Sequence, residues 1–379
     1  MAKKFTPLLD LVRKGGKINF EGLPTGIESF SKYFSHTQRG RYYLIGGDSG
    51  AGKTTFTDST FILNPYHHLY SNGKEINTKW NYISLEQSRE TKYARWASSI
   101  IYKEFDVLIP SNVIVGRAVR KLKKSEAEYI KRADDYLAEM LDYVDIVDHS
   151  LDSDSYYSYL IDYGNKHGKF VVKEEDLEVE EDNKKLSTLL EWIPNNPNIN
   201  HIFVLDHMAY MDTPNMSLKD SMDKVSRRTV ELREITGWTF VYIQQFNTEL
   251  GSVERQKFKK EMLAPTRQDF GDSRYTFRDA DVVIGLINPS LYKIDKYMKI
   301  DNVSDFGGLA VWSFLMKNRH DGPIDKHEAF LMNPIGLEFE AIPEDSDAMT
   351  YLSGGEVPSE RLRLKSKEIE KIVQTQWLK

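Results

Sequence analysis

Eight consecutive residues constrain the fold of this chain more than any other feature of its sequence. They follow the apolar run Tyr42–Ile45, match the pattern G-x-x-x-x-G-K-T, and precede a helix-compatible stretch, Thr55–Leu63. A strand, a glycine loop and a helix in this order form the context that a phosphate-binding loop requires. The loop consists of Gly47, Asp48, Ser49, Gly50, Ala51, Gly52, Lys53 and Thr54, and Thr55 follows it directly.

The residue types in this loop suit the binding of phosphate. Glycines let backbone N–H groups turn inward and form a concave anion site, and the helix that follows adds its positive N-terminal end. Lys53 is expected to reach the β- and γ-phosphates, and the Thr54 hydroxyl to help hold Mg²⁺. The sequence therefore predicts a chain that binds a nucleoside triphosphate together with Mg²⁺.

Composition excludes several other classes of protein. The 379 residues include no cysteine, which rules out disulfides, cysteine-based zinc sites and thiol nucleophiles. No segment resembles a signal peptide, and no apolar run approaches the roughly 18 residues that span a bilayer, so we expect a cytoplasmic protein without a membrane partner. The net charge of −6 argues against a wholly basic nucleic-acid surface but allows a local basic loop.

Apolar strand-like runs alternate with helical patterns along most of the chain. This alternation predicts an α/β fold with a mostly parallel central sheet flanked by helices, and with ligand chemistry at the carboxyl ends of the strands. The expected strands are Arg41–Ile45, Trp80–Leu85, Tyr143–Val147, Ile202–Leu205, Thr239–Ile243, Val282–Ile287, Ala310–Met316 and Ala329–Met332. The expected helices include Ser88–Lys103, Arg117–Leu141 and Met216–Ile235.

Two segments depart from this alternation. Residues 169–200 are interpreted as an insertion in which Glu174–Asp182 carries seven acidic residues in nine. A solvated surface excursion is the favoured interpretation, and a docking site for a basic partner is the alternative. After Pro343 the chain is polar and then forms an expected helix, whose apolar stripe packs either on the core or on a neighbouring subunit.

Carboxylates and an amide follow three of the predicted strands. Asp206 ends the run Ile202–Leu205 and is the candidate ligand for the Mg²⁺ shell, although a strand-ending aspartate is also a common turn former. Glu86 ends another apolar strand and is a candidate base, with charge complementing a helix N-terminus as the equal alternative. Gln245 ends a third and is a candidate sensor of the γ-phosphate, although this motif is weak on its own.

Basic residues form two further candidate sites. Lys317 and Arg319 close a strand at positions i and i+2 and therefore project from one face, where they can lie on a carboxylate or reach a neighbouring subunit's nucleotide. The segment Arg255–Lys260 carries four positive charges and one aromatic residue in six positions, which suits a single-stranded backbone and its bases. A solvated loop is the alternative there. The cations of the segment are Arg255, Lys257, Lys259 and Lys260.

Taken together and in order, these motifs resemble the C-terminal ATPase of DnaB-type replicative helicases, a group of RecA-like P-loop ATPases. The resemblance covers about residues 22–343 and rests on the loop 47–54, Ser84–Glu86, Asp206, Gln244–Asn247, Asp279–Asp281 and Lys317–Arg319. It implies a ring-shaped homo-oligomer, usually a hexamer, with ATP and Mg²⁺ between subunits and single-stranded DNA in the central channel. It also raises a primase or a helicase loader as a partner.

Matching positions carry the family's roles onto this chain. Glu86 would activate water, Asp206 would hold the metal's water shell, and Gln245 falls on the sensor glutamine. Lys317 and Arg319 fall on the trans-acting lysine and the finger arginine. The family's DNA-contacting loops correspond to about 248–260 and 269–274. Arg274 or Arg267 is expected to replace the family's DNA-contacting arginine, whose position is occupied by Gly271 here.

The sequence departs from the family pattern in several places. Only about forty residues precede the phosphate loop, so the family's N-terminal helical domain is missing; residues 1–21 are expected to be a linker helix that latches adjacent subunits, and residues 344–379 a partly helical tail. Gly271 stands where the family has a DNA-contacting arginine. Shortened relatives of this kind resemble phage-encoded helicases. Two alternatives remain: a RecA/RadA-like recombination ATPase that binds single-stranded DNA, and a RecA-fold ATPase that does not translocate.

Overall fold

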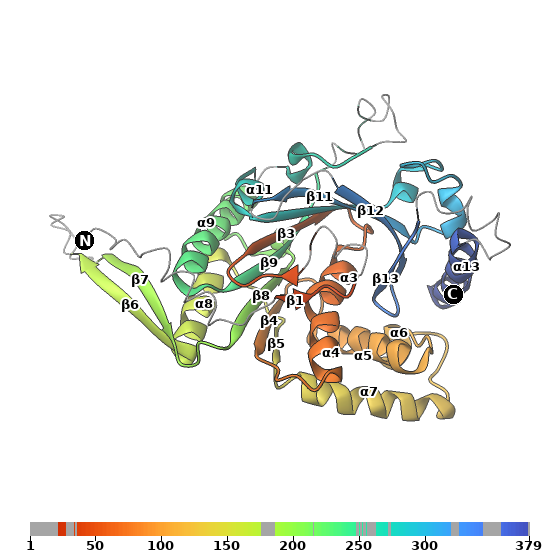
Figure 1. Cartoon of the computed structure of the whole chain (residues 1–379), viewed down its shortest axis with the longest axis horizontal. Coiled ribbons are helices and arrows are strands. Elements are labelled where there is room, and N and C mark those ends of the chain that lie inside the picture. The colour runs from red at the N-terminus through yellow and green to blue at the C-terminus, as the bar shows by residue number, and fades with distance from the viewer. Residues whose placement is uncertain are drawn as a thin grey trace.

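The chain folds around one large sheet with helices on both faces (Figure 1). The computed structural model describes residues 22–27, 34, 36–175, 186–214, 216–247, 250, 252, 255, 263–271, 274–319, 326–343 and 358–377. The N-terminal latch helix expected within residues 1–21 lies outside this part of the chain. Among the described residues no helix is both long and apolar enough to cross a bilayer.

Nine strands form the central sheet, in the order β13-β12-β11-β10-β3-β9-β8-β4-β5. Six neighbouring strands are parallel, and the last three at one side are antiparallel, so the predicted mostly parallel sheet is confirmed. All eight predicted strands are present, with their ends displaced by a few residues at most. The parallel strands are β10 (Val282–Ile287), β3 (Tyr42–Gly47), β9 (Thr239–Gln245), β8 (Asn200–Asp206), β4 (Thr78–Ser84) and β5 (Val144–Val147); the antiparallel ones are β11 (Ala310–Asn318), β12 (Lys326–Asn333) and β13 (Glu338–Ala341).

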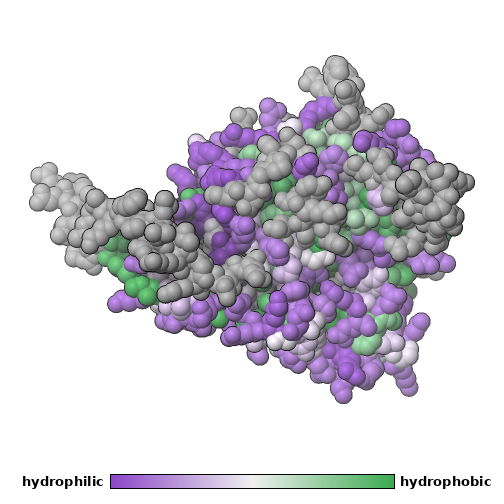
Figure 2. Space-filling view, in the orientation of Figure 1, coloured by the Kyte–Doolittle hydropathy of each residue, from purple (hydrophilic) through white to green (hydrophobic). Residues whose placement is uncertain are grey.

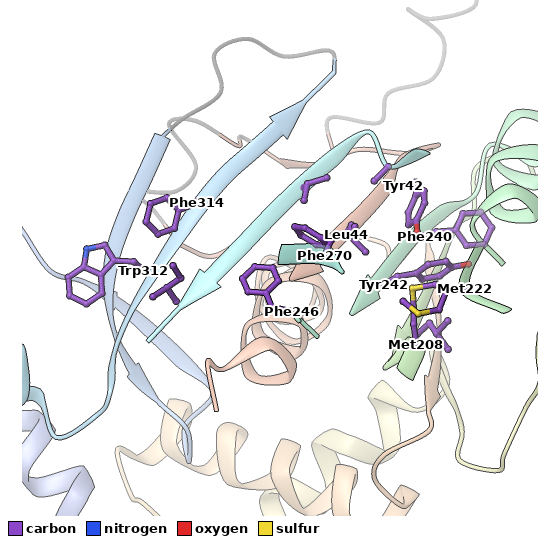
Figure 3. Close-up of a cluster of buried hydrophobic side chains, with 14 of the residues drawn as sticks. Tyr42, Leu44, Met208, Met222, Phe240, Tyr242, Phe246, Phe270, Trp312 and Phe314 are labelled. Atoms are coloured by element: carbon purple, nitrogen blue, oxygen red, sulfur yellow. The ribbon is translucent and has the colours of Figure 1, made fainter. Parts of the chain in front are cut away.

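Both faces of the sheet are covered because its central strands are apolar on both sides. Every residue of β3, β8 and β10 is buried, which is typical of parallel strands between helical layers. Successive side chains of β3 alternate between two cores: Tyr42 and Leu44 pack towards α8 (Ser153–His167) and α9 (Leu218–Thr236). Figure 3 shows part of this core, with Tyr42 and Leu44 beside Phe240 and Tyr242.

The other face of the sheet carries the helices that follow the phosphate loop. A continuous helical segment runs from α3 (Lys53–Asp58) through a π-helical turn, η1 (Ser59–Leu63), into α4 (Asn64–Ser71). The side chains of Tyr43 and Ile45 share this second core with Trp80 of β4 and Trp96 of α5. The remaining helices of this layer are α5 (Arg89–Phe105), α6 (Ser111–Ile114) and α7 (Ala127–Met140).

Two helix predictions are confirmed and one is wrong at its start. Helices α5 and α9 fall where Ser88–Lys103 and Met216–Ile235 were expected, and Ser88 and Ser217 cap their N-termini. The helix predicted from Arg117 begins only at a short 3₁₀ turn, η2 (Lys124–Glu126). There the Glu126 carboxylate accepts the Lys123 N–H at 2.8 Å and pairs with Arg120, so this N-terminal cap sets the start of the helix.

The predicted insertion contains a β-hairpin that the sequence analysis did not foresee. Strands β6 (Gly168–Glu175) and β7 (Leu186–Pro194) pair antiparallel and extend from the body (Figure 1). At its base Phe170 pairs with Trp192, and both rings pack on Trp238, so this end is part of the core. Farther out Val172 and Leu190 are 48% and 54% exposed, and Figure 2 shows hydrophobic surface over the hairpin. Most of the acidic run lies outside the described residues.

The C-terminal tail contains the expected helix, α13 (Pro358–Trp377). Leu362 and Ile369 are each 1% exposed and belong to the core that also contains Phe306. The apolar stripe of this helix therefore packs on the chain's own core. Trp377, which was expected to continue the stripe, has a side chain outside the described part of the chain.

Candidate nucleotide site

Strand register brings four predicted site residues to one edge of the sheet. Gly47 at the end of β3 is the partner of Gln245 at the end of β9, and Asp206 at the end of β8 is the partner of Ser84. Glu86 lies two residues beyond Ser84. Parallel strands end at the same edge, so the phosphate loop, the aspartate, the glutamate and the glutamine share the carboxyl edge of the sheet.

The glycine loop has the backbone that the motif predicts. Gly50 and Gly52 have φ values of 82° and 85°, which side-chain-bearing residues rarely adopt. A Cβ on Gly52 would also lie 2.5 Å from the sulfur of Met332. The N–H of Ala51 donates to the Asp48 carbonyl at 3.1 Å and closes the turn. The loop then enters the helical segment that starts at Lys53, so its N–H groups and the helix N-terminus suit a polyphosphate.

Lys53 lies in this loop within the field of several carboxylates. Its Nζ donates to the Asp48 carbonyl at 2.8 Å, and its side chain is largely buried. Burial lowers the pKa of Lys53, while Asp206, Asp48 and Glu86 oppose that shift. Burial raises the pKa of Asp48, whose carboxylate contacts the hydroxyl of Tyr292 on η7 (Pro289–Tyr292).

Asp206 and Thr54 supply oxygen ligands of the kind that Mg²⁺ prefers. The Thr54 hydroxyl lies 3.3 Å from Oδ1 of Asp206 and is its hydrogen-bond donor. No group of three or more histidine or acidic side chains in the described ranges could hold a metal alone. Mg²⁺ characteristically binds through one or two protein oxygens, waters and substrate phosphates, so this pair fits a metal that arrives with a nucleotide.

A buried polar cluster behind Asp206 was not foreseen from the sequence. Its members are Asp58 of α3, Tyr82 of β4, and Lys92 and Trp96 of α5. The Tyr82 hydroxyl donates to Oδ2 of Asp206 at 2.7 Å. Burial, followed by the charges of Asp206 and Asp58, raises the pKa of Tyr82 well above its usual range, so the hydroxyl remains a donor. Lys92 shares the inward stripe of α5 with Trp96 at spacing i, i+4, a signal that could have marked it as buried.

Glu86 and Gln245 both present exposed side chains at this edge, whereas Gln244 points inward. The Gln244 amide donates to the Phe270 carbonyl at 2.6 Å, and Asn247 N–H donates to the Asp269 carbonyl at 2.8 Å. Gln245 also hydrogen-bonds His207, whose pKa is lowered chiefly by burial and secondarily by Lys53. The end of β9 is thus joined both to the nucleotide edge and to the segment 263–271.

Lys317 and Arg319 lie at the opposite edge of the sheet. Lys317 of β11 is the partner of Val283, near the start of β10, and Val283 in turn is the partner of Leu44. The Lys317 ammonium donates to the carbonyls of Phe277, Arg278 and Ala280 at 2.6–3.0 Å. Burial, then the charge of Arg319, lowers the pKa of Lys317 to about 8.

Arg319 contacts the carboxylate of Asp281, which is one of the two placements expected from the sequence. Its guanidinium is 3.3 Å from Oδ1 of Asp281, and its side chain remains 42% exposed. A strand the length of β3 spans about 20 Å, so neither Arg319 nor Lys317 shares an edge with this chain's own phosphate loop.

The candidate DNA-binding residues are only partly described. Arg267 is exposed, with its guanidinium 5.8 Å from the centre of the Phe277 ring. The Arg255 guanidinium contacts the buried carboxylate of Asp269 and donates to the Ala264 carbonyl at 2.8 Å, so Arg255 braces the segment 263–271. Lys257, Lys259 and Lys260 lie outside the described residues, and Arg274 is described only in its backbone, at the start of α11 (Arg274–Asp279).

The order of the central sheet and the phosphate loop at its carboxyl edge together define a RecA-like P-loop fold. No protein-family model matches the sequence, and no curated protein matches it. Among solved structures it resembles the ATPase domain of a protein designated G40P, with a TM-score of 0.61 at 16% identity over 89% of this chain and 97% of that one.

A second solved structure is described as a DnaB-like replicative helicase with its interactions with primase. It aligns with a TM-score of 0.61 at 16% identity, over 90% of this chain and 69% of that one. The predicted resemblance to DnaB-type helicases is therefore confirmed at the level of the ATPase fold.

Proposed function

We propose that this chain is an ATP-dependent, ring-forming DNA helicase or translocase that acts on single-stranded DNA during replication. One observation carries the proposal: the phosphate loop, Asp206, Glu86 and Gln245 share one edge of the sheet, while Lys317 and Arg319 occupy the other. A nucleotide bound at the first edge can meet the second pair only when another copy supplies it. Head-to-tail contacts of this kind close into rings.

Each residue then has a stated task. The loop 47–54, with Thr55 behind it, holds the triphosphate, and Thr54 and Asp206 hold Mg²⁺, which draws charge from the phosphates when bound. Glu86 orients and activates the attacking water. Arg319 and Lys317 of a neighbouring copy stabilise the charge that develops on the transferring phosphoryl group.

The link from nucleotide to DNA runs through the end of β9. Gln245 faces the nucleotide edge, and the adjacent residues Gln244 and Asn247 are hydrogen-bonded to the carbonyls of Phe270 and Asp269. The segments on either side of these contacts carry the basic residues proposed to bind DNA, namely Arg255, Lys257, Lys259, Lys260, Arg267 and Arg274. A shift of Gln245 on hydrolysis would therefore move them.

The solved relatives support this proposal through fold, and one of them is described with primase. A hexamer, and a primase or loader as partner, accordingly belong to the same proposal. A RecA-fold ATPase without translocation is the competing function, because Arg255 is engaged by Asp269 and Gly271 offers no side chain to DNA.

The test combines hydrolysis with strand separation. We expect ATP hydrolysis to rise several-fold with single-stranded DNA and a forked duplex with a single-stranded tail to be unwound. A rate of ATP hydrolysis that single-stranded DNA does not change would favour the non-translocating ATPase. Stimulation of hydrolysis without strand separation would favour the recombination ATPase.

A further inference from the structure

The cluster behind Asp206 contains a fully buried lysine that the proposed reaction does not use. Lys92 is 0% exposed, as are Asp58 and Asp206. Its Nζ lies 3.3 Å from Oδ2 of Asp58 and 3.4 Å from Oδ2 of Asp206, and it donates to the Tyr82 hydroxyl at 2.7 Å. The three protons of the ammonium thus have three acceptors.

These contacts divide the two oxygens of Asp206 between different tasks. Oδ2 faces the interior and accepts from Tyr82 and Lys92, whereas Oδ1 accepts the Thr54 hydroxyl, on the side of the phosphate loop. A carboxylate held at one oxygen cannot rotate freely about its last bond. The interior contacts therefore determine which oxygen is presented to the metal.

Asp58 explains why the lysine does not simply neutralise Asp206. Asp58 is as near to Lys92 as Asp206 is, and it also accepts the Trp96 indole N–H at 3.2 Å. The cluster holds two carboxylates and one ammonium, so one negative charge remains beside the phosphate loop. When one member of a buried ion pair is removed, the other is left as an uncompensated charge. Removing both members of the pair is far better tolerated.

We infer that Lys92 is a positioning residue for the nucleotide's metal: it anchors Oδ2 of Asp206, while Asp58 offsets its charge so that Asp206 still attracts Mg²⁺. The inference rests on the proposed function, because it assigns the cluster to the metal site of that reaction. It also joins Asp206 to α5, the helix that begins three residues after Glu86.

Two substitutions separate the anchoring of Asp206 from the balance of charge. Asp58→Asn leaves the Lys92 charge without its offset, so the Mg²⁺ concentration for half-maximal binding of a fluorescent, non-hydrolysable ATP analogue should rise about tenfold. In Lys92→Met/Asp58→Asn the formal charge of the cluster is the same as in the wild type. The Mg²⁺ concentration for half-maximal binding of the analogue should therefore return to within about twofold of wild type. The loss of the Lys92 contact to Oδ2 should still lower turnover at saturating Mg²⁺ and ATP by about tenfold, with the KM for ATP little changed.

The matched control is Lys103→Met, on the same helix, whose ammonium donates to the neutral Asn64 side chain at 3.2 Å and is not part of the cluster around Asp206. It should change neither the Mg²⁺ concentration for half-maximal binding nor the turnover at saturating Mg²⁺ and ATP. An Asp58→Asn variant that melts at a lower temperature but keeps the wild-type Mg²⁺ half-saturation would overturn the inference and leave a structural ion pair. Should that variant fail to fold, the double variant decides, and unchanged turnover there overturns the inference.

The proposed function and the role of Lys92 can fail separately. If the wild-type protein shows no Mg²⁺-dependent nucleotide binding, the proposed function falls and this inference falls with it. If the wild type binds and hydrolyses ATP but all cluster variants behave like Lys103→Met, only the role of Lys92 is wrong.

Discussion

The two edges of the central sheet differ in what surrounds their lysines. At the carboxyl edge, burial lowers the pKa of Lys53, and its charged neighbours Asp206, Asp48 and Glu86 all oppose the shift. At the amino edge, burial lowers the pKa of Lys317 to about 8, and its strongest charged neighbour, Arg319, lowers it further, with Asp281 and Asp279 opposing. The first edge gathers acids around one cation, and the second places two cations together.

This difference supports the proposal that the two edges are complementary halves of one site formed between copies. Phosphoryl transfer needs a metal, a water-orienting group and positive charge on the transferring group, all around one phosphate. In the proposed reaction the carboxyl edge would supply the first two, and the amino edge of another copy would supply the third.

Removing the central cation of the carboxyl edge should have the largest effect. Lys53→Ala is expected to lower ATP hydrolysis by about a thousandfold or more, because the β- and γ-phosphates lose their direct cation. Steady-state phosphate release measures it, and Lys131→Ala on the exposed surface of α7 is the control. Appreciable hydrolysis by Lys53→Ala would move the active site away from this loop.

Removing the finger candidate at the amino edge should affect turnover without affecting binding. Arg319→Ala is expected to lower kcat by about a hundredfold to a thousandfold, while nucleotide affinity stays within about threefold of wild type. Arg278→Ala, at the same edge but paired with Asp279, serves as the matched control. Equal losses in both variants, or a loss of nucleotide affinity in Arg319→Ala, would point to a structural role at this edge.

The basic segment should matter for DNA rather than for nucleotide. Replacing Lys257, Lys259 and Lys260 with alanine is expected to weaken single-strand binding about tenfold and to flatten its salt slope by about 2. Arg255→Ala should differ, because loss of its contact with buried Asp269 lowers the melting temperature as well. An unchanged salt slope in the triple variant would remove these lysines from the DNA path.

The smallest expected effect is a dependence on pH at the amino edge. The charge of Lys317 is present below pH 8 and is lost as pH rises through about 8. Because the charge is proposed to act on the transition state, kcat should fall a few-fold across this range. In Lys317→Arg the guanidinium stays charged, so the decline near pH 8 should disappear. The same decline in wild type and Lys317→Arg would assign the titration to another group.

Much of the carboxyl edge could be predicted because its signals are local. The glycine loop is contiguous, and Asp206, Glu86 and Gln245 each end a strongly apolar run, so strand order alone brings them together. The same reasoning gave the eight strands and two of the helices. The helix expected from Arg117 failed at its start because a carboxylate cap at Glu126 was stronger than the weak helical pattern before it.

The remaining features depend on contacts between distant residues. Lys92 and Asp58 are 34 positions apart in the sequence. Each alone has the pattern of an ordinary charged residue on a helix. The hairpin of β6 and β7 depends on Phe170 and Trp192 meeting Trp238, which no pattern within the acidic segment reveals. The spacing of charged and aromatic residues also could not indicate that Arg255 pairs with Asp269.

Mixing two inactive variants tests whether the two edges meet only between copies. Lys53→Ala keeps a complete amino edge, and Arg319→Ala keeps a complete carboxyl edge. Equal amounts are combined, with affinity tags and light scattering to confirm mixed assemblies, and ATP hydrolysis is compared with that of each variant alone. We expect recovery towards about a quarter of wild-type activity, because that is the share of interfaces that pair two intact edges at random. Verified mixed assemblies with no more activity than the separate variants would contradict it.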